Sequence, residues 1–182
     1  MIRKVPLIFI VLLIASSAAV FADSSESYMF QTVLLVGSTD GESDLSGVPA
    51  NVVKALDDVT KFLPYKSCRL IDASLLRSNG EAQGLLKGPD GKDFELMFEF
   101  RGDQSGTLQV RGFRIDTLIA QPQDRTITEN GKTKVEHEPP RWVRRQVIAT
   151  SFSVKVGETI VVGTSKLNGT GEALIVLFTA MR

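Results

Sequence analysis

One stretch of the chain has the hydrophobic period of a helix. Between residues 52 and 63, apolar side chains recur at spacings of three and four, and charged residues largely fill the positions between them. Ser46 is a candidate N-cap, Pro49 suits the first turn, where its missing N–H costs nothing, and Pro64 ends the stretch. The pattern predicts one amphipathic helix of about four turns.

Most of the remaining chain has a period of two, which is typical of strands. Residues 28–36 are apolar and β-branched, and in residues 94–101 phenylalanine and leucine alternate with mostly polar side chains. Residues 107–120 predict a further strand, with Gly112 at a candidate bulge. Residues 173–180 are nearly all apolar, as expected of a strand that is buried on both faces.

Turn residues divide these strands from one another. Asn79 and Gly80 lie between two apolar segments and predict a hairpin, because both residues tolerate positive φ. Gly157 turns the chain between two alternating segments near the end. Residues 121–140 are polar and hold three of the seven prolines, so we expect an excursion or a small exposed hairpin on the end of the main sheet.

Together these elements predict an α+β fold. We expect a predominantly antiparallel β-sheet of about eight strands, with one amphipathic helix near the N-terminus that covers one face of the sheet. Residues 23–182 are predicted to form a single α+β domain.

Residues 1–22 have the three parts of a secretory signal. Arg3 and Lys4 precede an apolar run, and small residues lead up to Ala22. We predict cleavage after Ala22 and a periplasmic or secreted location in a bacterium; the alternative is an uncleaved membrane anchor. No cysteine lies at the end of the apolar run, so a lipoprotein-type acylation site is absent there.

Composition narrows the class of partner. The chain has 21 basic and 21 acidic residues, and cleavage would remove two basic ones, leaving 19 against 21, or a net charge of −2. A near-neutral chain does not favour nucleic acid or an anionic membrane surface as its partner. No later stretch is long and apolar enough to span a bilayer as a helix.

The sequence offers little chemistry for catalysis. His137 is the single histidine, flanked by Glu136 and Glu138, and no second histidine can complete a zinc site. Cys68 is the single cysteine, so no intramolecular disulfide can form, and its apolar surroundings predict a buried, unreactive thiol. No motif supports a Cys68–His137 pair. We therefore predict no catalytic residue, no cofactor site and no metal site, which favours a non-catalytic protein over an enzyme.

One aromatic residue among arginines is a candidate binding site. Trp142 is surrounded by Arg141, Arg144 and Arg145, and a tryptophan in such a setting can anchor a protein partner. The alternative is a residue at the end of a sheet that is covered by arginine stems.

Residues 153–163 (SVKVGETIVVG) resemble a hairpin of bacterial outer-membrane secretins that ends in paired glycines. Thr164 stands here in place of the second glycine, and the likeness covers about a dozen residues of a pattern that many hairpins share. Residues 23–182 also resemble small exported bacterial proteins with the same order of parts. This second resemblance implies location and fold but no activity.

These observations predict an exported, non-catalytic protein of the periplasm or cell envelope. We expect a protein-interaction module that binds another envelope protein and is linked to secretion or pilus machinery. Two alternatives stay open: an exported hydrolase of unknown substrate, which would use carboxylates, and a small-ligand or lipid carrier, since antiparallel sheets can enclose apolar cavities.

Overall fold

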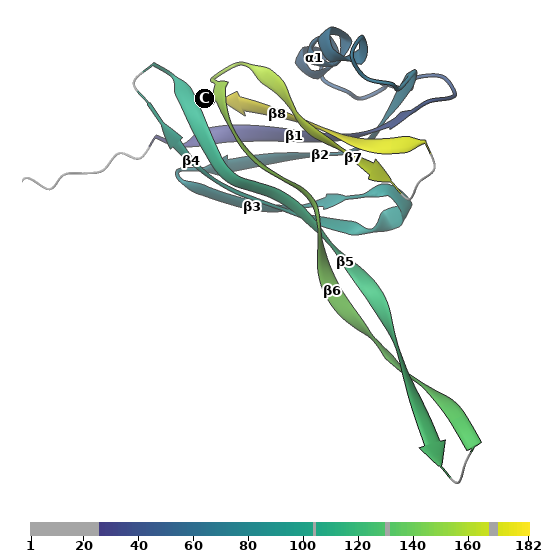
Figure 1. Cartoon of the computed structure of the whole chain (residues 1–182). Coiled ribbons are helices and arrows are strands. Elements are labelled where there is room, and N and C mark those ends of the chain that lie inside the picture. Colours follow the sequence, from purple (N-terminus) through teal and green to yellow (C-terminus); the bar gives the residue numbers. More distant parts are fainter. Residues whose placement is uncertain (1–25, 104, 130–131, 168–170) are drawn as a thin grey trace, which may run out of the picture.

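Two antiparallel sheets of four strands pack face to face, a helix covers the outer face of one sheet, and a two-stranded arm extends from the other (Figure 1). The computed structural model describes residues 26–103, 105–129, 132–167 and 171–182. The predicted fold class, mostly antiparallel β with one α-helix, is confirmed. The elements are β1 (Tyr28–Ser38), α1 (Ala50–Thr60), β2 (Ser67–Ser78), β3 (Glu81–Lys87), the short 3-10 helix η1 (Pro89–Gly91), β4 (Asp93–Gly102), β5 (Thr107–Glu129), β6 (Lys132–Lys155), β7 (Thr159–Leu167) and β8 (Glu172–Met181).

The predicted signal, residues 1–22 with cleavage after Ala22, lies outside the described residues. The first and last strands of the described chain are neighbours: β8 pairs with β1 along almost the whole length of β1.

Both sheets contain strands that are neighbours in the chain, but the chain changes sheet at two tight turns. The strand order is β2-β1-β8-β7 in one sheet (sheet A) and β3-β4-β5-β6 in the other (sheet B). Asn79 and Gly80 do form a tight connection, as predicted, but β2 and β3 belong to different sheets and do not pair. The strands meet face to face: a Cβ added at Gly84 would lie 3.1 Å from the side chain of Leu76. The residues of a turn fix the reversal of the chain, not the pairing of its strands.

The core between the sheets is built around aromatic rings. Phe98 on β4 lies 5.1 Å from Phe30 and 5.2 Å from Phe178, measured between ring centroids, and both pairs meet edge to face. Phe113 on β5 extends the cluster, with its ring centroid 5.9 Å from that of Phe98. Such rings bury large apolar areas, and edge-to-face pairs add a further about 0.5–1.5 kcal/mol each.

A second core lies between sheet A and α1. Because side chains alternate along a strand, even positions of β1 and β8 enter the core between the sheets and odd positions face the helix. The prediction that residues 173–180 are buried on both faces is confirmed, and α1 is the reason. This second core contains Val33, Leu35, Val52, Leu56, Cys68, Ile175 and Leu177.

Helix α1 is shorter than predicted and begins differently. It covers Ala50–Thr60, and Pro49 occupies the N-cap position with an extended backbone and no side-chain cap. The prediction of Ser46 as the cap is wrong, because Ser46 bonds to the Asp44 carboxylate in the preceding loop. The helix is instead held by its apolar face and by Asn51, whose Nδ2 lies 2.8 Å from Thr159 Oγ1.

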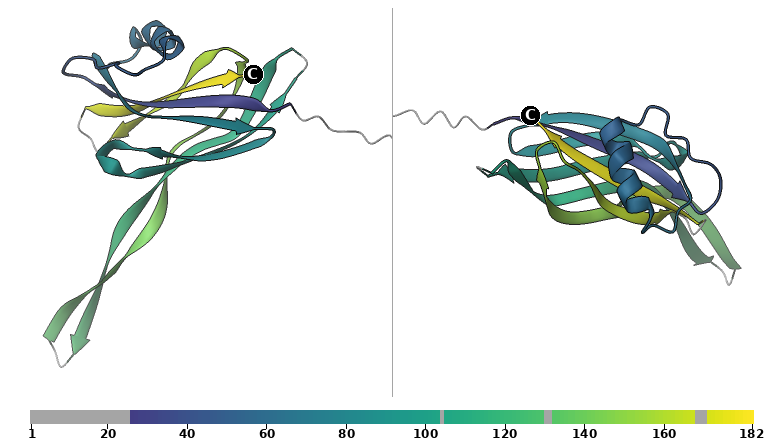
Figure 2. Two further views of the ribbon diagram at one scale, coloured as in Figure 1. Left: turned by 180° about the vertical axis from the view of Figure 1, so that it is seen from behind. Right: turned by 90° about the horizontal axis from the view of Figure 1, so that it is seen from above.

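Strands β5 and β6 are far longer than the sheet that contains them. β5 pairs with β4 only as far as Thr117, and beyond this residue its described pairing is with β6 alone. We call residues 118–129 of β5 and 132–144 of β6 the arm; it projects well beyond the two sheets (Figures 1 and 2). The polar residues 121–140, predicted to be an excursion or a small hairpin, form the outer part of this arm. The predicted bulge at Gly112 is confirmed by its φ of +57° and the register shift beside it.

Candidate functional site

The four residues predicted to bind a partner all lie on β6 where the arm joins the body. Their backbone partners on β5 run in regular register, from Thr117 opposite Arg145 to Gln121 opposite Arg141. Because successive side chains of a strand point to opposite faces, Trp142 and Arg144 lie on one face and Arg141 and Arg145 on the other. The structure therefore places the four residues together along the chain but divides them between two surfaces.

The first surface is the outer face of sheet B at the root of the arm. Trp142 is 65% exposed, and Ala120 lies opposite it on β5. Leu118 on β5 and Leu85 on β3 are also exposed and line a shallow hollow on this face. We call the three residues Leu85, Leu118 and Trp142 the outer patch.

Arg144 is held beside the outer patch by an ion pair. Its Nη2 lies 2.6 Å from Oε2 of Glu95 on β4, so the side chain crosses over β5. The guanidinium lies over the hollow that Leu85 and Leu118 line. The ion pair therefore holds the Arg144 side chain against sheet B. Trp142 stays exposed beside it and can contact a partner.

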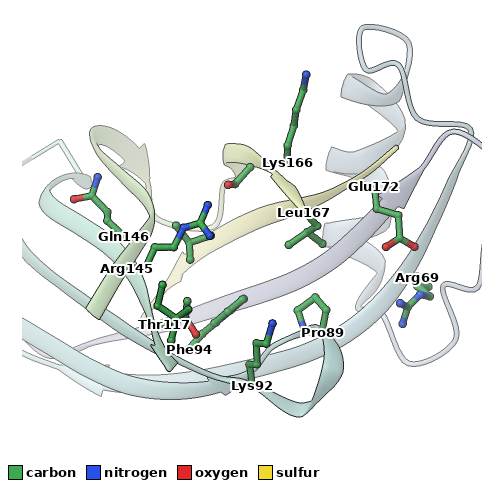
Figure 3. Close-up of a pocket in the computed structure, with 13 residues that line it drawn as sticks. Arg69, Pro89, Lys92, Phe94, Thr117, Arg145, Gln146, Lys166, Leu167 and Glu172 are labelled. Carbon is green, nitrogen blue, oxygen red and sulfur yellow. The ribbon is translucent and has the colours of Figure 1, made fainter. Parts of the chain in front are cut away.

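On the second surface, Arg145 but not Arg141 lines a cavity of about 300 Å³ between the sheets, at the end from which the arm leaves. Its walls come from β6, from β7 and from the segment that joins β3 to β4 (Figure 3). Arg145 and Lys92 extend into it from different walls, whereas Lys166 points away. Its apolar lining comes from Pro89, Phe94, Ile119, Val147 and Leu167.

Among the described residues, no acidic side chain pairs with Arg145 or Lys92, the two cations that extend into this cavity. The side chains of Arg145 and Lys92 form no ion pair or hydrogen bond with any described residue, in contrast to Arg144 with Glu95. Glu172 is the one acidic side chain among the described residues that line the cavity. The cavity therefore combines apolar walls with an excess of positive charge.

Sequence reasoning identified only part of this cavity. Arg145 was a predicted binding residue, but Lys92 was not, because a lone lysine after a Pro-Asp-Gly turn is an ordinary surface residue. No pattern in the sequence predicts that Lys92 and Arg145 line the same cavity. Their proximity depends on the order of strands in sheet B and on where β7 ends.

Cys68 and His137, the two residues considered as a nucleophile pair, belong to different elements of the fold. Cys68 is buried at the start of β2, under α1, and burial raises the pKa of its thiol above the ordinary value of 9.0. His137 lies on the arm, where its backbone is paired with that of Asp124. Cys68 was also predicted to be buried, and this is confirmed.

The residues that the structure describes contain neither a metal-binding cluster nor a membrane-spanning helix. Among them, no group of three or more histidine, cysteine, aspartate or glutamate side chains is arranged to hold a metal ion. No helix among those residues has the length and apolar character needed to cross a bilayer.

Comparisons with known proteins add no assignment. Neither a family model, nor a curated protein, nor a solved structure matches this chain. The geometry of the described residues is therefore the basis for any functional assignment.

Proposed function

We propose that this protein is a non-catalytic binding module of the bacterial cell envelope, which uses the arm and the outer patch to hold a partner protein. The observation that carries the proposal is the arm itself. Its strands continue from the core of sheet B, and its described side chains from residue 120 to 126 and from 138 to 142 are all exposed.

An uncovered two-stranded ribbon is an unusual element for a chain to maintain. A hairpin in water is marginally stable by itself, and its outer edges present unpaired backbone groups. Beyond Thr117 the described pairing of β5 is with β6 alone, so both edges of the arm are open. A partner strand added to either edge would satisfy these backbone groups, which is a common mode of peptide recognition.

The outer patch supplies the apolar part of the contact. Tryptophan is among the residue types that carry most of the binding energy at protein interfaces. Trp142 lies at the base of the arm, and Leu118 is its neighbour on the same face. A partner strand on the arm would pass close to this patch, so the two features support one contact.

The envelope location in this proposal rests on the predicted signal in residues 1–22. A link to secretion or pilus machinery rests on the sequence resemblance of residues 153–163 alone, because the two strands that they join, β6 and β7, lie in different sheets and do not pair as a hairpin. An exported hydrolase has less support. Asp40, Glu42 and Glu172 line one hollow, but no three acidic, histidine or cysteine side chains among the described residues are arranged to hold a metal ion.

The test is site-specific photo-crosslinking in the native envelope. A photo-reactive amino acid at Ala120, beside Trp142, should crosslink to one partner protein, whereas the same group at Lys54 on α1 should not. Trp142→Ala should weaken the complex by about tenfold or more. Phe62→Ala is the matched control, because Phe62 is also a large apolar residue, is 83% exposed, and lies away from the arm.

Two results would contradict the proposal. One is equal recovery of crosslinked protein from the two positions. The other is a complex that Trp142→Ala and Phe62→Ala weaken to the same extent.

A further inference from the structure

We propose that the cavity at the root of the arm binds an organic anion, a carboxylate carried on a short hydrocarbon chain. This site is separate from the outer patch: Arg145 faces the cavity, whereas Trp142 and Arg144 lie on the opposite face of the same strand. The inference therefore goes beyond the proposed function and does not depend on it.

The charge of the cavity selects an anion. Lys92 and Arg145 extend into the space from different walls, and neither has an acidic partner among the described residues (Figure 3). Two cations that face one hollow repel each other, and a bound carboxylate would relieve this repulsion. The guanidinium of arginine presents paired donors that match the two oxygens of a carboxylate.

The apolar walls select a hydrocarbon group. Phe94 is 3% exposed and lies at the floor, while Ile119, Val147 and Leu167 line the sides. A chain that enters between these side chains removes their exposed surface from water, which stabilises the complex by roughly 25 cal/mol for each Å² of apolar surface buried. A small inorganic anion has no hydrocarbon chain and would gain no stabilisation from burial of apolar surface.

The size of the cavity limits the ligand. About 300 Å³ lies at the lower end of the range for small-molecule sites. It suits one short alkyl chain and one headgroup. A two-chain lipid would have to leave most of its apolar surface in water.

Further charged side chains lie around the cavity. Arg69 and Lys166 border the cavity outside the two cations that enter it, and Glu172 is the acid beside them. In this proposal the headgroup lies next to Lys92 and Arg145, and the hydrocarbon chain points towards the apolar lining at Phe94.

The test uses octanoate as the probe and residues 23–182 as the protein. Isothermal titration should give saturable binding of one octanoate per chain. Acetate has the charge without the chain, octan-1-ol has the chain without the charge, and octylammonium reverses the charge. Each of the three should bind at least about tenfold more weakly than octanoate, since each lacks or reverses one of the two interactions.

Substitutions then locate the site. Arg145→Gln and Lys92→Gln should each weaken octanoate binding by about tenfold, because each removes a charge-assisted contact. Arg141→Gln is the matched control: it removes an arginine from the same strand, outside the cavity, and should leave the affinity unchanged. Circular dichroism checks the fold of each variant, and Lys92, in an exposed turn, gives a substitution that leaves the core untouched.

Three results would overturn the proposal. They are octanoate binding no tighter than acetate, equal binding of octylammonium, and an octanoate affinity that neither Arg145→Gln nor Lys92→Gln changes. Because Trp142 lies on the other face of β6, loss of partner crosslinking in Trp142→Ala tests the proposed function and leaves this result unaffected.

Discussion

The guanidinium of Arg144 on β6 crosses over β5 to the carboxylate of Glu95 on β4, where Nη2 and Oε2 lie 2.6 Å apart. These two side chains join the root of the arm to a strand at the centre of sheet B. The pair is half-exposed on the arginine side and more buried on the glutamate side. Because the pair is partly exposed, it contributes little to the stability of the whole fold; its main effect is to orient the root of the arm.

Arg144→Gln should lower the free energy of unfolding by at most about 1 kcal/mol, because partly exposed ion pairs contribute little. The loss should shrink at high salt, which screens the pair. Urea denaturation of the single variants and of the double variant with Glu95→Gln measures the coupling between the two residues. A coupling energy of zero at low salt would show that the contact does not hold the arm.

Thr32→Val should stabilise the protein by about 1 kcal/mol. Thr32 is 1% exposed in the centre of β1, and its Oγ1 has no hydrogen-bond partner among the described residues. Valine has nearly the same shape and removes the unsatisfied hydroxyl.

The matched control for Thr32 is Thr179→Val on the neighbouring strand β8. The Thr179 hydroxyl lies 2.7 Å from Thr159 Oγ1 and 3.2 Å from Asn51 Nδ2, so its removal should destabilise the protein. Thermal unfolding of the two variants should give shifts of opposite sign, and a lower melting temperature for Thr32→Val would refute the account of its hydroxyl.

Phe98→Ala should cost about 3–5 kcal/mol of stability, because the ring is 1% exposed and contacts aromatic rings from both sheets. Phe62→Ala removes the same number of atoms from a side chain that is 83% exposed, and should change stability by less than about 0.5 kcal/mol. Denaturant midpoints for the two variants measure the difference, and comparable losses would contradict the assignment of the core.

Cys68 should make the protein less stable as the pH rises above about 9. Burial raises the pKa of the folded thiol above 9.0, so the unfolded thiol releases its proton first and the unfolded state is favoured. This destabilisation is absent while the pH is below the ordinary pKa of the thiol. It reaches its full size once the pH exceeds the pKa of the folded state. The difference in unfolding free energy between the wild type and Cys68→Ala, followed from pH 7 to pH 10.5, isolates it from other titrating groups. A difference that does not change with pH would contradict the burial of the thiol.

Local patterns in the sequence predicted the elements well, because each element depends on its own residues. The apolar run 173–180 predicted a strand buried on both faces, and the period of residues 52–63 predicted a helix with one apolar face. The end of that helix was overestimated, because apolar spacing continues through Phe62 and Leu63 after the helical backbone has ended at Thr60.

Those local patterns do not determine which strands pair with one another or which strands share a sheet. Asn79 and Gly80 predict a reversal whether the next strand pairs or crosses to another sheet. The pattern of residues 121–140 predicts an excursion or a small exposed hairpin and not a long arm, because polar residues and prolines weaken the signal of a strand whose two faces are both exposed. No sequence pattern predicts the cavity, because Lys92 and Arg145 are far apart in the chain and line one hollow only through the order of strands in sheet B and the position where β7 ends.

The pairing of β1 with β8 sets the order in which this chain can fold. β1 needs residues 172–181 as its neighbour, and the aromatic core needs Phe178. A nascent chain therefore cannot complete sheet A until almost all of it has been synthesised. A chain truncated before Glu172 should show no cooperative thermal transition. If residues 1–22 act as the secretory signal that their sequence predicts, such late closure would keep the polypeptide unfolded during export.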